Sequence, residues 1–230
     1  MHVHPGGLGR LKPPDWDHVS KYPLSAIGVE SLTKPAPVQL GIAWMSNFDN
    51  PVKDSAGVYW IGKGNLGTER GGHAICAQPP SLIDRPEWIS FYNQGQTPEC
   101  VGFSCSRGQS LEKGVEFNPV WLYNAARNFE GNHSEEGGST VRAALHVLLK
   151  KGARPAGSKA PDPLDGVSAY RWATKWDEVR AALGLSDSED GVLLDQSWGD
   201  EGYPPHVRLT DEAGEWLLQH EGEAGLFCER

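Results

Sequence analysis

Residues 93–106, with the sequence NQGQTPECVGFSCS, are the stretch from which the fold is interpreted. Thr97 is a favourable helix N-cap, and Pro98 fits the first helical position, where its missing N–H costs nothing. Cys100 is then expected in the first turn of a helix, where free N–H groups and the helix dipole favour a thiolate. Gln94 carries an amide that can donate a hydrogen bond to an oxyanion. These features predict a nucleophilic cysteine, and a buried core cysteine is the alternative.

Two further segments place polar residues at the ends of predicted strands. Residues 72–77, GHAICA, predict a strand of small and apolar residues with His73 at its start. A histidine there can deprotonate a cysteine and later return the proton to a leaving amine. Residues 191–199, GVLLDQSWG, predict a buried strand that ends in polar residues. The alternatives are a structural histidine or a His73–Cys76 metal pair for the first segment, and a plain core strand for the second.

Together these segments resemble the active-site segments of papain-like cysteine peptidases. The resemblance implies that Cys100 is the nucleophile, that His73 is its base and later an acid, and that Gln94 contributes to an oxyanion hole. In this family an asparagine orients the catalytic histidine, and a tryptophan shields their hydrogen bond from water. Gln196 stands in place of that asparagine and is one methylene longer, and Trp198 matches the tryptophan.

The resemblance extends to residues 135–145, EEGGSTVRAAL, where the family has a Gly-Gly whose backbone pairs with the substrate. It implies that Gly137 and Gly138 bind substrate, and an ordinary loop followed by a helix N-cap is the alternative; Trp198 is also expected to line the substrate site. Asp195 is a second candidate for orienting His73, although the alternation of side chains along a strand directs it to the opposite face.

The order of the motifs differs from the family. In papain-like peptidases the cysteine precedes the histidine, whereas here His73 precedes Cys100. The chain therefore resembles a circularly permuted member, of bacterial or phage type, in which the strands of residues 37–77 have moved ahead of the cysteine helix. The acidic segment 186–190, SDSED, is consistent with a rejoining point. Such an order is compatible with catalysis, because one catalytic geometry occurs with several chain orders.

The expected fold class is α+β, with two lobes and a cleft between them. We expect a helical lobe, residues 93–152 with the helix at 174–183, against a twisted antiparallel sheet formed by residues 37–77 and 188–210. Residues 1–35 are expected to form an extended N-terminal arm, and residues 36–230 a single papain-like catalytic domain.

Hydrophobic periodicity and cap residues predict the individual elements. The expected strands cover 37–44, 57–61, 72–77, 88–92 and 191–199. The expected helices begin at Cys100, cover 118–128, run from a cap at Ser139 to Gly152, cover 174–183, and extend from a cap at Thr210 toward the C-terminus. Residues 153–168 are expected to form a loop.

Composition indicates a soluble globular protein and excludes some partners. Of 230 residues, 38% are hydrophobic and 22% charged, and the formal net charge is −9, which argues against a nucleic-acid partner. There is no apolar run of membrane-spanning length and no signal peptide. We therefore expect a cytoplasmic protein, or a virion-associated one if it is phage-encoded, without a membrane partner.

The four cysteines, Cys76, Cys100, Cys105 and Cys228, lack the spacing of a zinc site and are too few for a disulfide scaffold. A reducing compartment is the default for such a chain. We expect neither a metal nor a cofactor, and a single Cys76–Cys228 disulfide remains open.

Three functions are compatible with these features. The first is a thiol peptidase that cleaves a peptide or protein substrate. The second is a catalytically lapsed papain-fold protein of virion type that assembles with other structural proteins, which the Gln196 substitution favours. The third is a permuted papain-fold acyltransferase or amidase.

Overall fold

The computed structural model of the chain describes residues 34–82, 92–133, 137–198 and 203–229. Most of the expected arm at 1–35 and of the expected strand at 88–92 lies outside the described residues. Within them the helices are α1 (Cys100–Lys113), α2 (Pro119–Glu130), α3 (Val141–Lys151), α4 (Trp176–Leu183) and α5 (Asp211–Gln219), with short 3-10 turns at Ser46–Asp49, Pro80–Leu82 and Pro163–Asp165. The strands are β1 (Val38–Met45), β2 (Val52–Lys53), β3 (Tyr59–Ile61), β4 (Glu69–Gln78), β5 (Val167–Trp172), β6 (Val192–Asp195), β7 (His206–Leu209) and β8 (Glu223–Glu229).

The described strands form one mixed sheet in the order β2-β3-β7-β6-β4-β1-β8-β5. The pairing of β3 with β7 is parallel, and the other described ladders are antiparallel. The expected α+β class and largely antiparallel sheet are therefore confirmed. None of the described helices is long and apolar enough to span a membrane.

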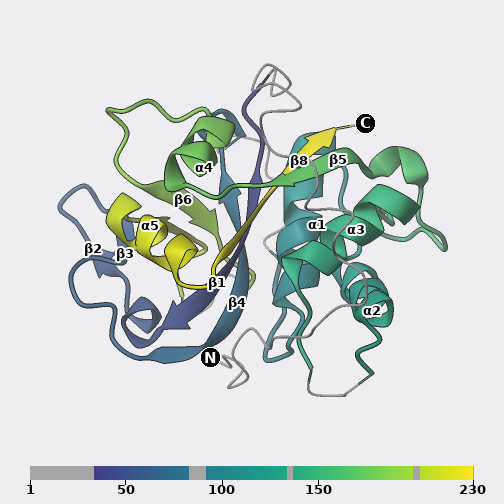
Figure 1. The fold of residues 1–230 in the computed structure, drawn as a ribbon, viewed down its shortest axis with the longest axis horizontal. Helices are drawn as coiled ribbons and strands as arrows, with labels where there is room; N and C mark the ends of the chain where they lie inside the picture. The colour runs from purple at the N-terminus through teal and green to yellow at the C-terminus, as the bar shows by residue number, and fades with distance from the viewer. Residues whose placement is uncertain (1–33, 83–91, 134–136, 199–202, 230) are drawn as a thin grey trace.

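The central strand β1 is covered on both faces. Its alternate residues Val38, Leu40, Ile42 and Trp44 pack into a core shared with α4 and α5. The opposite face turns toward the other helices, since a Cβ on Gly41 would lie 3.3 Å from a methyl group of Val141 in α3. Figure 1 shows α4 and α5 on one side of the sheet and α1, α2 and α3 on the other.

This arrangement corrects the predicted lobes. The helix at 174–183 was expected in the helical lobe, but α4 packs with α5 on the opposite side of the sheet. Its apolar residues Trp176, Val179, Ala182 and Leu183 are buried against the strands. Helical periodicity shows which face of a helix is buried, but it carries no information about which side of the sheet receives that face.

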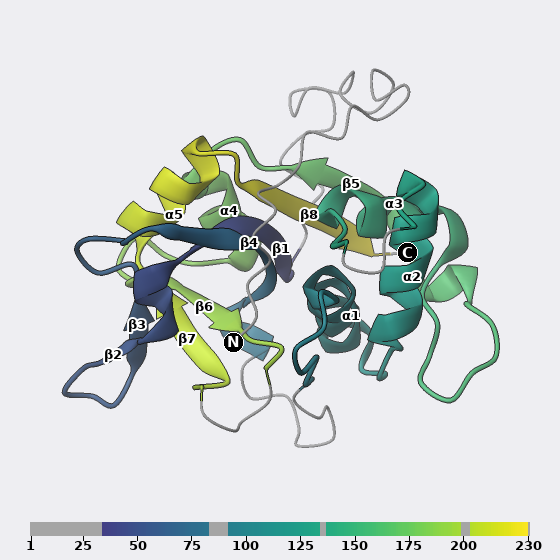
Figure 2. The ribbon, with the colours of Figure 1, turned by 90° about the horizontal axis from the view of Figure 1, so that it is seen from below.

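Helix α1 packs on β4 beside α2 and α3 (Figure 2), and most of its side chains are buried. Gly102 permits the close approach of α2, because a Cβ there would lie 2.3 Å from the carbonyl oxygen of Pro119. Gly114 ends the helix in the left-handed region at φ 69°, where glycine has no steric penalty.

Two predicted helix caps are wrong by one or two residues. The N-cap of α1 is Glu99, not Thr97, because the Thr97 hydroxyl donates to the Gln94 carbonyl and closes a turn ahead of the helix. The N-cap of α3 is Thr140, whose hydroxyl accepts from the Ala143 N–H, whereas Ser139 donates to a side chain in α2. The predicted cap of α5, Thr210, is confirmed.

Four strands of the sheet, β2, β5, β7 and β8, are not among the expected strands. Strand β5 begins inside the expected loop at 153–168, and β8 occupies part of the expected C-terminal helix. Glu221, with φ 66°, and Gly222 interrupt the helix. The following segment then pairs with both β1 and β5.

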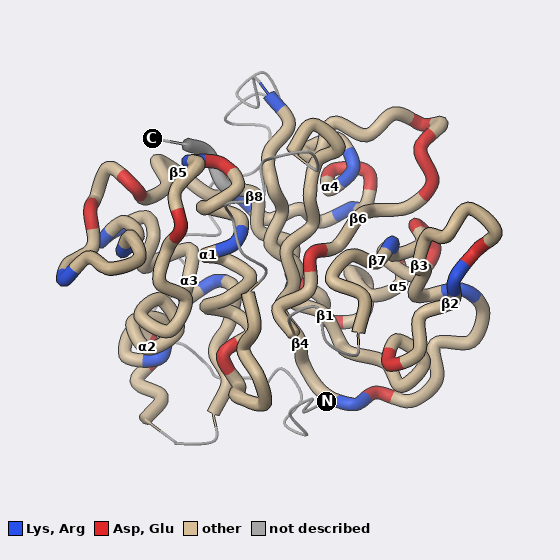
Figure 3. Tube along the Cα trace, turned by 180° about the vertical axis from the view of Figure 1, so that it is seen from behind, with Lys and Arg blue, Asp and Glu red and all other residues tan. Residues whose placement is uncertain are grey.

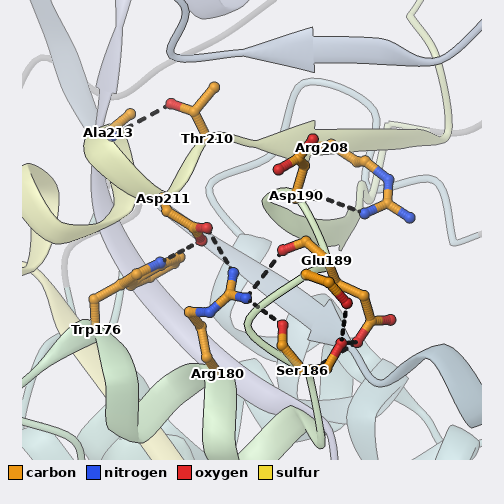
Figure 4. Close-up of polar contacts among 10 residues, drawn as sticks. Trp176, Arg180, Ser186, Glu189, Asp190, Arg208, Thr210, Asp211 and Ala213 are labelled. Carbon is orange, nitrogen blue, oxygen red and sulfur yellow. Dashed lines mark hydrogen bonds and ion pairs between the residues drawn. The ribbon is translucent and has the colours of Figure 1, made fainter.

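The acidic segment 186–190, between α4 and β6, is tied to the rest of the fold (Figures 3 and 4). Arg180 donates to the carbonyl oxygens of Ser186 at 2.7 Å and Glu189 at 2.9 Å. The same guanidinium pairs with Asp211 of α5 at 2.6 Å. This segment is therefore a specific connection between α4, α5 and β6.

Candidate active site

Cys100 is the first residue of α1 and is partly exposed. Burial raises the pKa of its thiol, and the backbone N–H groups of Ala74, Val101 and Cys100 itself oppose that rise. The sulfur therefore lies against the backbone of Ala74, the neighbour of His73 in β4. Cys100 and Ala74 belong to one apolar cluster where α1 packs against β4, so the predicted nucleophile lies near the strand that contains the predicted base, His73.

His73 lies in an aromatic enclosure. Its ring stacks on Trp198 with centroids 4.5 Å apart and meets Trp44 edge-on at 5.1 Å. Its Nε2 atom lies 3.3 Å from Oε1 of Gln196, so the longer amide reaches the histidine. Burial lowers the pKa of His73 to about 4, against a smaller rise from Gln196. The imidazole is therefore neutral at pH 7.

This burial predicts a pH dependence of stability. In the unfolded chain His73 binds a proton with an ordinary histidine pKa near 6.5, whereas in the folded protein it binds one only near pH 4. Stability is consequently lost as the pH falls through this window, by about 3 kcal/mol. Urea unfolding of the wild type and of His73→Gln at pH 7 and pH 4 measures it. Equal losses in both proteins would show that His73 does not titrate in this way.

Gln94 is held by the residue that follows Gln196. The Ser197 hydroxyl donates to Oε1 of Gln94 at 2.5 Å, and the Gln94 N–H donates to the Ser197 carbonyl at 2.7 Å. Nε2 of Gln94 donates to the Thr97 carbonyl at 2.8 Å. An amide nitrogen has two hydrogens, so one remains for another acceptor. Ser197 was not among the predicted site residues, and its position within QSWG is the signal that could have identified it.

Asp195 does not orient His73. Its carboxylate is buried and accepts hydrogen bonds from Arg107 of α1 and from Gln78 of β4. Burial raises the pKa of Asp195, while the Arg107 charge opposes that rise. The alternation of β6 thus directs Asp195 toward α1 and Gln196 toward His73, so the alternative role for Asp195 is wrong.

The predicted substrate-binding glycines lie beside α2. The Tyr123 hydroxyl donates to the Gly137 carbonyl at 2.7 Å, and the Asn132 amide donates to the Gly138 carbonyl at 3.1 Å. A Cβ on Gly102 would lie 2.7 Å from Cβ of Tyr123. Tyr123 therefore connects this loop to the first turn of α1, close to the predicted nucleophile. Sequence patterns did not identify Tyr123.

Two other cysteines provide no reactive alternative. Cys76 and Cys105 are free and fully buried. Burial raises the pKa of Cys76 to about 12, so its thiol stays protonated. Because Cys76 is a free cysteine, the Cys76–Cys228 disulfide that the sequence left open is wrong. Among the described residues no group of three or more His, Cys, Asp or Glu side chains is placed to hold a metal ion.

The fold is similar to that of a known cysteine protease. Xylellain, a cysteine protease from Xylella fastidiosa, matches with a TM-score of 0.50 and 14% sequence identity. The match covers 66% of this chain and 90% of xylellain. No family model and no curated protein matches the sequence. At this identity the similarity establishes the fold.

Proposed function

We propose that this chain, which has the papain-like cysteine protease fold, is a thiol-dependent peptidase. In this proposal Cys100 attacks the carbonyl carbon of a peptide bond while His73 takes the thiol proton. His73 then gives that proton to the leaving amine, and water hydrolyses the thioester. The Gln94 amide and the Cys100 backbone N–H stabilise the oxyanion.

The observation that supports the proposal is the packing of α1, which begins at Cys100, against β4, the strand that contains His73. The sulfur lies against the N–H of the residue after His73, and Gln196 and Trp198 hold the ring from two directions. A neutral histidine is the form that can accept a proton. The low pKa of His73 is thus compatible with a resting thiol–imidazole pair in which proton transfer accompanies attack.

We also infer that the chain is a circular permutation of the papain-like order. The Ala36 N–H donates to the Ala182 carbonyl at 2.9 Å, so the start of β1 lies at the end of α4. Gln78 is paired with Leu193, so the end of β4 lies at the start of β6. Short connections at these two places are sufficient to insert the segment from β1 to β4 between α4 and β6, which supports the inference.

A catalytically lapsed relative is the second candidate. It is favoured by the buried Nε2 atom of Gln196, which has no hydrogen-bond partner among the residues that the structure describes, and by the raised pKa of Cys100. Buried amide nitrogens without a hydrogen bond are rare, so the Gln196 side chain is an unusual group for orienting a catalytic histidine.

Selective labelling of Cys100 tests the peptidase proposal. We expect an epoxide-based thiol inhibitor with a peptide-like backbone to modify Cys100 at least about tenfold faster than any other cysteine, because Cys100 is partly exposed and, in this proposal, His73 takes its proton as it attacks. Mass spectrometry of peptide fragments locates the adduct. Labelling of Cys105 or Cys228 at the rate of Cys100 would contradict the proposal. Selective labelling without cleavage of any peptide in a library would favour the lapsed protein.

A further inference from the structure

Glu99, directly before Cys100, has a side chain that the helix does not use. It occupies the N-cap position of α1, but its side chain makes no capping hydrogen bond. The carboxylate instead lies 2.9 Å from the Thr97 hydroxyl, whose single hydrogen it shares with the Gln94 carbonyl. Glu99 is partly exposed, so its negative charge is available at the approach to the sulfur.

Tyr123 and Arg127 of α2 are engaged with each other and with the loop at Gly137. The Tyr123 hydroxyl donates its proton to the Gly137 carbonyl and accepts from Arg127 at 3.1 Å. The Arg127 guanidinium lies over the Tyr123 ring, 5.2 Å from its centroid. Burial raises the pKa of Tyr123, and the negative charges of Glu99 and of a Cys100 thiolate add smaller rises. Arg127 acts in the opposite direction on the same phenol.

Glu99 lies near the reacting sulfur because it directly precedes Cys100 in the chain. Consecutive Cα atoms are about 3.8 Å apart. The carboxylate of the residue before Cys100 can therefore reach substrate side chains next to the carbonyl carbon that the sulfur attacks. A cationic side chain beside the scissile bond would gain attraction from Glu99, and an anionic one would be repelled. At a separation of about 6 Å in water, a cationic and an anionic substrate side chain differ by about tenfold in binding constant or rate constant.

We propose that Glu99 is a specificity residue that selects substrates with a lysine- or arginine-like cation immediately beside the bond cleaved at Cys100. This inference rests on the proposed peptidase function, because it names the substrate class of the same site. It assigns to Glu99 an interaction with the substrate and no part in proton transfer.

A test independent of turnover uses two methanethiosulfonate reagents of opposite charge, one with a trimethylammonium group and one with a sulfonate group. In each case the Cys100 thiolate attacks the reagent sulfur, a disulfide forms and methanesulfinate leaves. We expect the cationic reagent to modify Cys100 about tenfold faster than the anionic one. Glu99→Gln should lower this ratio to about two or less, and Glu69→Gln, an exposed carboxylate at the start of β4, should leave it unchanged. Cys100→Ser supplies the background from other cysteines.

A second measurement uses coumarin-amide peptides with Arg, Gln or Glu directly before the cleaved amide. The wild type should prefer Arg over Glu, and Glu99→Gln should lose that preference while still cleaving the Gln peptide. The role of Glu99 is overturned if the two reagents modify wild-type Cys100 at nearly equal rates, or if Glu99→Gln leaves the ratio of the two rates unchanged. Either result leaves the peptidase proposal intact. Failure of both reagents to modify Cys100 overturns both proposals.

Discussion

Replacement of His73 by alanine is expected to lower kcat/KM for a cleaved peptide by about 10³-fold. General acid–base catalysis contributes about 10² to 10⁴, and without the imidazole the protonated Cys100 thiol has no base beside it. The loss should fall mainly on kcat, because the histidine acts on the reacting atoms. Steady-state kinetics with a coumarin-amide peptide measure it.

The matched control for this variant is His220→Ala. His220 is exposed and stacks on Trp216 at 4.0 Å, at the end of α5, so its removal should change kcat/KM by less than about twofold. Circular dichroism and urea unfolding at pH 7 establish that His73→Ala is folded. A folded His73→Ala protein that keeps a tenth or more of the wild-type activity would exclude His73 as the base.

Arg107→Met is expected to destabilise the protein by about 3 to 5 kcal/mol. Arg107 lies two turns after Cys100 on α1, and its buried guanidinium pairs with the buried Asp195 of β6. Removing one partner leaves an uncompensated charge in the interior, which is the costly case for a buried ion pair. Urea unfolding at pH 7 measures the change in the free energy of unfolding.

Two further variants separate the buried charge from the lost packing. The double variant Arg107→Met/Asp195→Asn should recover a large part of the loss, because neither charge then remains. Arg70→Met removes the exposed partner of Asp49, a 3.2 Å pair, and should cost no more than about 1 kcal/mol. If Arg107→Met cost as little as Arg70→Met, the Arg107–Asp195 pair would not be a major support of the α1–β6 contact.

Short-range patterns predicted the local features of this fold well. Alternation in residues 37–44 identified the face of β1 that packs with α4 and α5, and the turn before Cys100 predicted the start of α1, even though Thr97 is not the cap. Alternation also predicted that Asp195 would face away from His73. Each of these features depends on residues near one another in the sequence.

The features that the sequence did not predict depend on contacts between residues distant in sequence. Strand β8 was predicted as part of a helix, because its pairing with β1 and β5 outweighs local propensity. Ser197 and Tyr123 acquire their roles from contacts across 103 and 14 residues, with Gln94 and Gly137. No local pattern distinguishes such a serine or tyrosine from one that makes no such contact.

The position of β6 late in the chain has a consequence for a protein still emerging from the ribosome. His73 and Cys100 leave the ribosome first, but Gln196, Ser197 and Trp198 are translated almost a hundred residues later. A nascent chain therefore has its histidine without an orienting amide and its Gln94 without an anchor. In the proposed peptidase, activity would begin only after Trp198 has been synthesised, which would protect the shorter nascent chain from its own cleavage.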